Sequence, residues 1–179
     1  MKGPARRACK IDFVVESELW EEAGNLKPLL RSAVAEAAQV LSTGGAELAI
    51  VLTDDSTIRL LNRDWRGVDK ATNVLSFPTE TFGGKPRLLG DIVLAYETVA
   101  REAHTEGKPF AHHLAHLTVH GFLHLNGYDH ERKREAEKME ELERQILRRL
   151  AIPDPYAPVA RSRARRHALP RRAEPGETR

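Results

Sequence analysis

The chain has 179 residues, 28 basic and 26 acidic side chains, one cysteine and a formal net charge of +2. This length favours one domain, and a single cysteine excludes an internal disulfide framework and fits a reducing compartment. The longest aliphatic run, at residues 48–52, is far shorter than the roughly 20 apolar residues that cross a bilayer. The basic N-terminus lacks the apolar segment of a secretory signal. We therefore expect a cytoplasmic protein without a membrane segment.

The charge divides the chain into two parts. From Ala157 onward there are seven arginines and two glutamates, whereas the 156 residues before it carry 21 basic and 24 acidic groups. The C-terminal part has three prolines and no apolar periodicity, so burial cannot offset the entropy of ordering it. We predict one domain over residues 1–156 and an Arg-rich disordered tail over 157–179. The tail either contacts RNA phosphates or is a solubilising extension.

In chain order, the predicted elements are a strand at 11–16, a helix at 26–41, a strand at 46–53, a short helix after Asp54, a strand at 74–78, a turn at 83–86, a strand at 90–96, and helices at 97–106, 110–126 and 131–150. Asp54 offers an N-cap to the short helix, whose apolar stripe is Ile58, Leu61 and Trp65. The last helix has the pattern of an ordinary amphipathic helix. Because most strands come early and most helices late, we predict an α+β fold with a small mixed β-sheet packed with several helices.

Three histidines stand at spacings typical of metal ligands. His120 and His124 are four residues apart on the predicted helix, so their side chains project from one face about one turn apart. Gly127 can adopt a positive φ, end the helix and return the chain towards the pair, which brings His130 close. Three imidazoles with an open fourth position indicate a catalytic metal centre, since a structural one has four protein ligands.

The same offsets occur in the metzincin peptidase pattern H-E-x-x-H-x-x-G-x-x-H. In that pattern a glutamate, the general base, directly follows the first histidine, but this chain has Gly121 there. The absence of this carboxylate argues against a protease.

The other polar residues near these histidines leave alternatives open. His116 is a partner of a metal ligand, a nucleic-acid contact or simply exposed, whereas we expect His112 and His113 on the surface. Asp129 either orients an imidazole ligand or caps the following helix, and we favour capping.

The block from His120 to His130 reads His-Gly-Phe-Leu-His-Leu-Asn-Gly-Tyr-Asp-His. It matches the signature H-G-x-L-H-L-x-G-Y-D-H, so the sequence resembles the YbeY family of rRNA maturation factors. Further agreement comes from blocks that stand in family order: Leu61-Asn62, Arg66-Gly67, Thr72-Asn73-Val74-Leu75-Ser76-Phe77-Pro78 and Leu89-Gly90-Asp91-Ile92. The resemblance covers roughly residues 10–152.

The resemblance implies a single-strand-specific metallo-endoribonuclease with one zinc ion per chain held by His120, His124 and His130. It also implies a zinc-peptidase-like (metzincin-like) catalytic core. The expected partners are a single-stranded rRNA precursor and the ribosome or its small subunit, with roles in 3′-end maturation of small-subunit rRNA and in ribosome quality control. No DNA partner is expected. Arg66 stands where the family keeps a functionally important arginine.

These residues suit RNA cleavage chemically. A guanidinium offers a planar fork that matches phosphate and keeps its charge, so we predict Arg66 and the zinc ligand His124 as catalytic residues. Without the family resemblance, the sequence favours a loop salt bridge of Arg66 with Asp64 or Asp69. Asn73 and Ser76 could line the groove. The net negative charge of residues 1–156, here called the acidic body, is unusual for a nuclease. Local charge at the cleft nevertheless matters more for binding than net charge.

Two other functions remain open. The chain could be a ribosome-assembly factor in which zinc is mainly structural and catalysis is weak or absent. It could also be a metallohydrolase that acts on another substrate.

Overall fold

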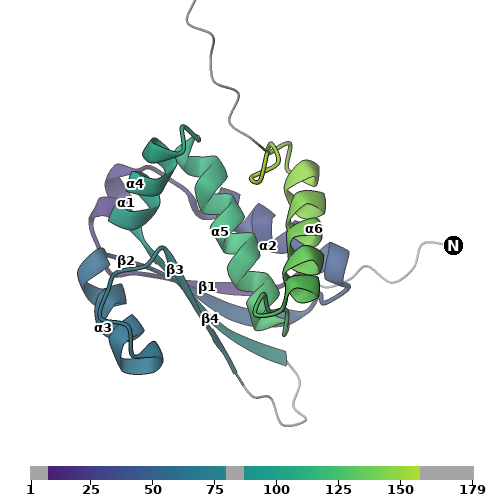
Figure 1. Cartoon of the computed structure of the whole chain (residues 1–179), viewed down its shortest axis with the longest axis horizontal. Coiled ribbons are helices and arrows are strands. Elements are labelled where there is room, and N and C mark those ends of the chain that lie inside the picture. Colours follow the sequence, from purple (N-terminus) through teal and green to yellow (C-terminus); the bar gives the residue numbers. More distant parts are fainter. Residues whose placement is uncertain (1–7, 80–86, 158–179) are drawn as a thin grey trace, which may run out of the picture.

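The computed structural model describes residues 8–79 and 87–157 (Figure 1). Its elements are β1 (Lys10–Val15), α1 (Leu19–Glu22), α2 (Lys27–Leu41), β2 (Ala46–Thr53), α3 (Asp55–Arg66), β3 (Val74–Pro78), β4 (Arg87–Ala95), α4 (Tyr96–Thr105), α5 (Phe110–Leu125) and α6 (Lys133–Arg149). The predicted turn at 83–86, and the predicted disordered tail beyond Ala157, lie outside the described residues. Within the described ranges, no helix is both long and apolar enough to cross a membrane.

The strands form one four-stranded mixed sheet in the order β1-β2-β4-β3. β1, β2 and β4 are parallel to one another, whereas β3 pairs antiparallel with β4. β3 therefore lies at an edge of the sheet. The predicted α+β class with a small mixed sheet is confirmed.

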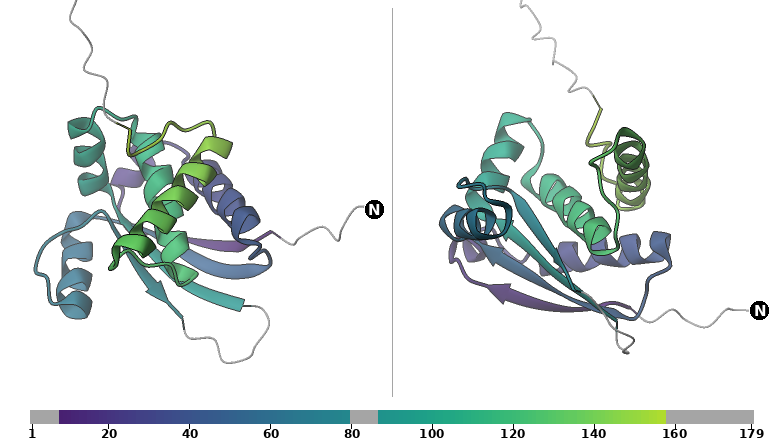
Figure 2. Two further views of the ribbon diagram at one scale, coloured as in Figure 1. Left: turned by 45° about the vertical axis from the view of Figure 1, so that its right-hand side comes forward. Right: turned by 60° about the horizontal axis from the view of Figure 1, so that its bottom comes forward.

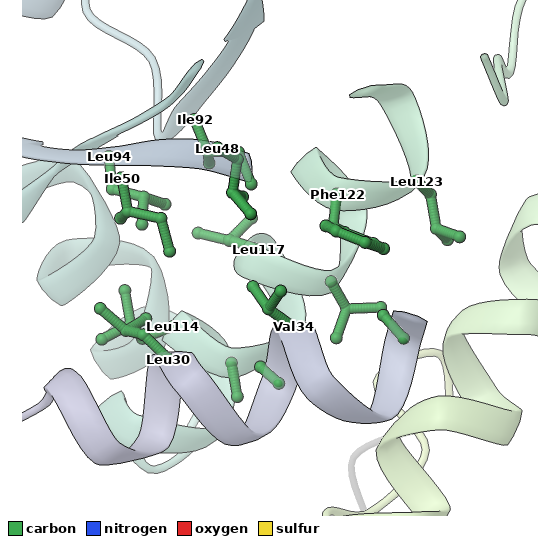
Figure 3. Close-up of a cluster of buried hydrophobic side chains, with 14 of the residues drawn as sticks. Leu30, Val34, Leu48, Ile50, Ile92, Leu94, Leu114, Leu117, Phe122 and Leu123 are labelled. Atoms are coloured by element: carbon green, nitrogen blue, oxygen red, sulfur yellow. The ribbon is translucent and has the colours of Figure 1, made fainter. Parts of the chain in front are cut away.

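The two faces of the sheet are covered differently because successive strand residues point to opposite sides. Ile92 and Leu94 of β4 belong to the main core with α2, α5 and α6 (Figure 3), and these helices stack over one face (Figure 2). Val93, between them, belongs to a smaller cluster that contains Ile58 of α3. Helix α3 therefore packs on the opposite face, near the edge strand.

Helix α5 approaches the sheet closely at Gly121. A Cβ at this position would lie 2.9 Å from Cγ2 of Ile92 and 3.1 Å from Oγ of Ser76, and the Ser76 hydroxyl donates a hydrogen bond to the Gly121 carbonyl (3.3 Å). The glycine thus allows the histidine-bearing end of α5 to lie directly against β3 and β4.

Most predicted elements are present, and the differences are local. The short helix α1 was not predicted, although it buries Trp20. α2 ends with Ser42 in the left-handed region (φ 59°), one residue before the predicted Thr43-Gly44-Gly45 stop. The prediction for the α3 stripe is wrong at its last member, because Trp65 is 71% exposed.

Candidate metal centre and the cleft around it

Helix α5 presents two of the three histidines to solvent and packs its other faces in the core. The neighbouring Val119, Phe122 and Leu123 are fully buried, which fixes the rotation of the helix about its axis. His120 and His124 then lie on the same face, with their Nε2 atoms 3.1 Å apart.

The chain reverses after α5 and returns the third histidine. Gly127 has φ +84°, a conformation that costs a glycine little, and its N–H donates to the carbonyl of His124 (3.0 Å). The ring of His130 lies 5.0 Å from that of His124 and 5.5 Å from that of His120, measured between centroids. The three rings predicted to converge from their spacing do so.

The three rings also fit a metal ion by distance and by chemistry. One ligand atom from each histidine can be chosen so that all three lie within 4.8 Å of one another. Tetrahedral coordination at about 2.0–2.1 Å places two ligand nitrogens about 3.3 Å apart, close to the Nε2 separation of His120 and His124. The pKa of His124 is lowered mainly by burial and, to a smaller extent, by the nearby His120 and His130. A lower pKa favours the neutral imidazole that a metal requires.

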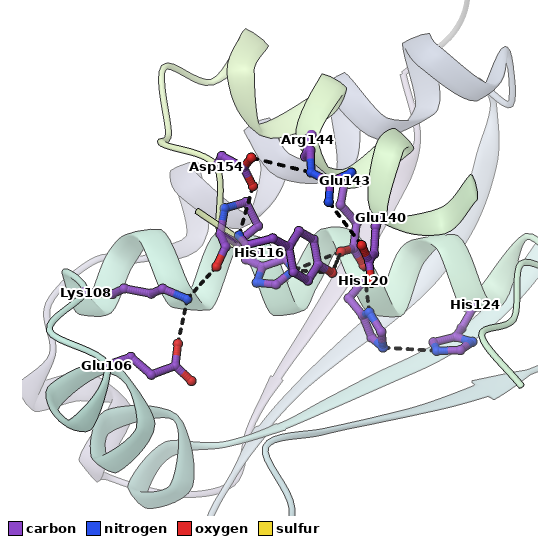
Figure 4. A network of polar contacts seen from close by, with 11 residues as sticks. Glu106, Lys108, His116, His120, His124, Glu140, Glu143, Arg144 and Asp154 are labelled. Atoms are coloured by element: carbon purple, nitrogen blue, oxygen red, sulfur yellow. Dashed lines mark hydrogen bonds and ion pairs between the residues drawn. The ribbon is translucent and has the colours of Figure 1, made fainter. Parts of the chain in front are cut away.

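A buried carboxylate from α6 holds one of these rings from behind (Figure 4). Glu143 is 0% exposed, and its two oxygens lie 2.7 Å from Nδ1 of His120 and 3.0 Å from Nε2 of His116. Burial alone would raise the pKa of Glu143, but hydrogen bonds from His116 and His120 lower it to about 2. Because an ionised carboxylate only accepts, His120 donates its Nδ1–H to Glu143 and leaves the Nε2 lone pair for a metal.

Tyr156 covers this carboxylate from the other side. Its hydroxyl donates a hydrogen bond to Glu143, its ring lies edge-on to His116 (5.6 Å between centroids), and the guanidinium of Arg144 stacks over it (5.0 Å). Of the three alternatives for His116, the contacts favour a supporting role, since His116 reaches His120 through Glu143.

We expect Glu143→Gln to weaken zinc binding about 10- to 100-fold in a protein that still folds. The substitution keeps the volume but removes the charge that orients His120, and loss of such partners of a ligating histidine typically has this effect. Competition with a chromophoric chelator measures the affinity. The control is Glu140→Gln on the same helix, because Glu140 pairs with Arg144 and with no histidine of the described part of the chain. Equal affinities in the two variants would contradict the positioning role.

A cleft of about 650 Å³ opens beside the three histidines. Its lining comes from the end of α3, the edge strand with the loop before it, the C-terminal part of α5 and the segment after α5: Trp65, Arg66, Thr72, Asn73, Val74, Leu75, Ser76, Phe77, Pro78, His120, His124, Gly127, Tyr128, Asp129, His130 and Glu131. Arg66, Asn73 and Ser76, all singled out from the sequence, thus share one cleft with the histidines.

The alternative that Arg66 forms a loop salt bridge is wrong for the described residues. Asp69 is bound by Arg59 (2.7 Å) and Asp64 by Arg63 (2.8 Å). Arg66, the last residue of α3, has no ion pair within residues 8–79 and 87–157 and is exposed at the cleft. Its guanidinium is therefore available to a ligand.

Two side-chain predictions near the site are wrong. Asp129 does not cap α6, which begins at Lys133 without a side-chain cap; instead its carboxylate accepts from the backbone N–H of His130 (2.7 Å). His113 is 5% exposed, not on the surface, and its Nε2 pairs with Glu102 (2.8 Å). The same Glu102 oxygen accepts from the amide of Asn73 (2.9 Å), so His113 helps to fix a cleft residue.

The chain is similar to known proteins along most of its length. The sequence profile of a family described as endoribonuclease YbeY matches residues 15–151. Proteins named endoribonuclease YbeY from Nitrobacter hamburgensis and Rhodopseudomonas palustris are each 56% identical to this chain, over 158 and 152 residues. The matches cover 84% and 82% of this chain and 83% and 80% of the two relatives. The solution structure of TM1509 from Thermotoga maritima is 26% identical, covering 83% of this chain and 99% of that one, with a TM-score of 0.48.

Proposed function

The chain belongs to the YbeY family of endoribonucleases, and on this basis we propose that its cleft cleaves single-stranded RNA with a zinc ion held by His120, His124 and His130. The observation that carries the proposal is the convergence on one cleft of three imidazoles and Arg66, which has no ion pair among the residues that the structure describes. The substrate proposed from the family resemblance is a small-subunit rRNA precursor. The proposal therefore includes the ribosome or its small subunit as a partner and a cytoplasmic location.

The proposed metal is zinc, one ion per chain. Three neutral imidazoles with an open position are a usual catalytic zinc set, although nickel and cobalt also suit these ligands. A bound zinc ion polarises a phosphoryl oxygen or lowers the pKa of a bound water towards about 7.

The side chains in and behind the cleft would bind the phosphate and orient the metal ligands. Arg66 offers two parallel N–H donors to a phosphate and stabilises the charge that develops during cleavage. Glu143 keeps the ring of His120 in one tautomer and one orientation. Asn73 and Ser76 add polar groups along the edge strand.

Charge at the cleft explains how an acidic body can bind RNA. The formal charges that line the cleft are Arg66 against Asp129 and Glu131, so its net charge is negative without a metal. A divalent cation makes the same lining net positive. Attraction of a phosphate to this cleft would then depend on the metal, as local rather than total charge decides such binding.

A peptidase-like arrangement of the site is compatible with this proposal, whereas peptidase activity is not favoured. We propose a metzincin-like core because the helix with two histidines, the glycine turn and the third histidine follow that order. At position 121, where the peptidase pattern has its glutamate, a Cβ would lie only 2.9 Å from Cγ2 of Ile92 and 3.1 Å from Oγ of Ser76, so any larger side chain would be crowded there.

The test uses end-labelled single-stranded RNA that carries a small-subunit rRNA 3′ precursor, with a matched duplex and a DNA strand of the same sequence as controls. We expect cleavage of the single-stranded RNA alone, its loss with a chelator and its return with zinc. Cleavage that survives the chelator, or that is equally fast on the duplex, would contradict the proposal.

A further inference from the structure

The two tryptophans of the chain have opposite environments. Trp20 is 3% exposed, donates its indole N–H to the carbonyl of Thr53 (2.7 Å) and packs against Tyr96 and Phe110. Trp65 is 71% exposed, whereas the other exposed large hydrophobic residues of the described chain are at most 49% exposed. Because a tryptophan gains much from burial, this exposure calls for a physical reason.

The reason lies in where α3 meets the sheet. Ile58, Leu61 and Trp65 follow one another at helical spacing and share a face of α3. Ile58 is fully buried against the sheet in the cluster that contains Leu75 and Val93. Trp65 stands near the C-terminal end of α3 and lines the cleft. Its one ring contact within the described residues is with Phe77 of the edge strand.

That contact supports the indole ring without covering it. The rings of Trp65 and Phe77 meet edge to face, with centroids 5.6 Å apart and planes at 65°. Phe77 is itself half-buried and packs on the small cluster under α3. The indole is thus anchored on one side while Trp65 stays 71% exposed, and both Trp65 and Arg66 line the cleft.

We propose that Trp65, backed by Phe77, is a stacking subsite for one unpaired nucleobase of the RNA. This inference rests on the proposed function, and it adds a cause for single-strand specificity. Every base has a π-face that stacks on an aromatic side chain independently of sequence. In a duplex the bases are stacked within the helix, so only a splayed single strand can offer one.

The position of the subsite suits a nucleotide next to the cleaved bond. Trp65 and Arg66 are consecutive, and both line the cleft with the three histidines. A base on the indole would therefore bring an adjoining phosphate to the guanidinium. The other exposed large hydrophobic residue of α3, Leu60 (49% exposed), lies about 140° around the helix from Trp65 and does not line the cleft.

The first arm of the test compares cleavage of single-stranded RNA by the zinc-loaded wild-type protein, Trp65→Ala, Trp65→Phe and the control Leu60→Ala. We expect Trp65→Ala to lose about 10-fold or more in kcat/KM, with Trp65→Phe retaining most of it and Leu60→Ala unchanged. The loss should shrink on an abasic strand, which a merely structural role of Trp65 would not produce. Cleavage of both strands by Trp65→Ala at the wild-type rate would overturn the subsite and leave the ring as a contact for another protein.

The second arm reads the stacking itself. Stopped-flow mixing of wild-type protein with the RNA should show quenching of tryptophan fluorescence before cleavage, and Trp65→Phe, which keeps the buried Trp20, should not show it. Quenching that persists in Trp65→Phe would contradict the proposal. If the wild-type protein quenches but does not cleave, the proposed endoribonuclease function fails while the base-binding subsite stands.

Discussion

His124→Ala is expected to abolish RNA cleavage, by about a thousandfold or more, while the protein stays folded. The substitution removes the middle ligand of a three-histidine centre, and the loss of metal catalysis is worth several kcal/mol of barrier. The fold should survive because the core is built from aliphatic side chains on the other faces of α5, and the centre lies at the cleft. Cleavage, zinc content and thermal melting are measured on the same preparation.

His112→Ala is the matched control for this variant. His112 is a half-buried imidazole on the same helix and does not line the cleft, so zinc content and cleavage should stay at the wild-type level. A His124→Ala protein that is unfolded would instead support a structural zinc, whose binding energy is of the order of 10 kcal/mol. The assembly-factor alternative would then account better for the chain.

Arg66→Ala is expected to lower kcat by about a hundredfold, or ~3 kcal/mol, with zinc content unchanged. Arg66 has no ion pair within residues 8–79 and 87–157, where Arg59 and Arg63 bind Asp69 and Asp64, so its loss removes a contact to the substrate. Arg66→Lys should recover part of the rate, since it keeps the charge but not the planar fork.

Arg63→Ala serves as the control for position 66, because it removes a cation from the same exposed turn but from outside the cleft lining. Its cleavage rate should stay within about twofold of wild type. A comparable loss in Arg63→Ala would mean that the general charge of α3, not the position of Arg66, drives catalysis.

The sequence predicts the convergence of the histidines because the relevant geometry is local. A four-residue step on a helix and a glycine turn determine where His120, His124 and His130 can lie, whatever the rest of the chain does. The four strands follow from equally local patterns of apolar residues. These parts of the site need no knowledge of tertiary packing.

Glu143 could not be assigned in the same way because its role depends on how α6 packs against α5. It lies 23 residues after His120, in a stretch that resembles an ordinary amphipathic helix. A signal was present: Glu143 stands one turn from both Met139 and Ile146, on the stripe that faces the core. A carboxylate on such a stripe needs a partner, and the sequence does not identify that partner.

Trp65 shows that an apolar stripe on a helix does not by itself predict how deeply each of its residues is buried. The stripe of α3 correctly predicts which side of the helix meets the sheet, but it carries no information about how far the sheet extends. Ile58 packs against the strands of the sheet, whereas Trp65 lies beyond them and lines the cleft.

The most direct test of a zinc-dependent RNA-cleaving cleft is a titration of the metal-free protein with zinc while cleavage of single-stranded RNA is followed. We predict that the rate rises in proportion to bound zinc and stops rising at one ion per chain, with no such rise in His124→Ala. Cleavage by the metal-free protein at the full rate, or no cleavage once one zinc ion is bound per chain, would contradict the account.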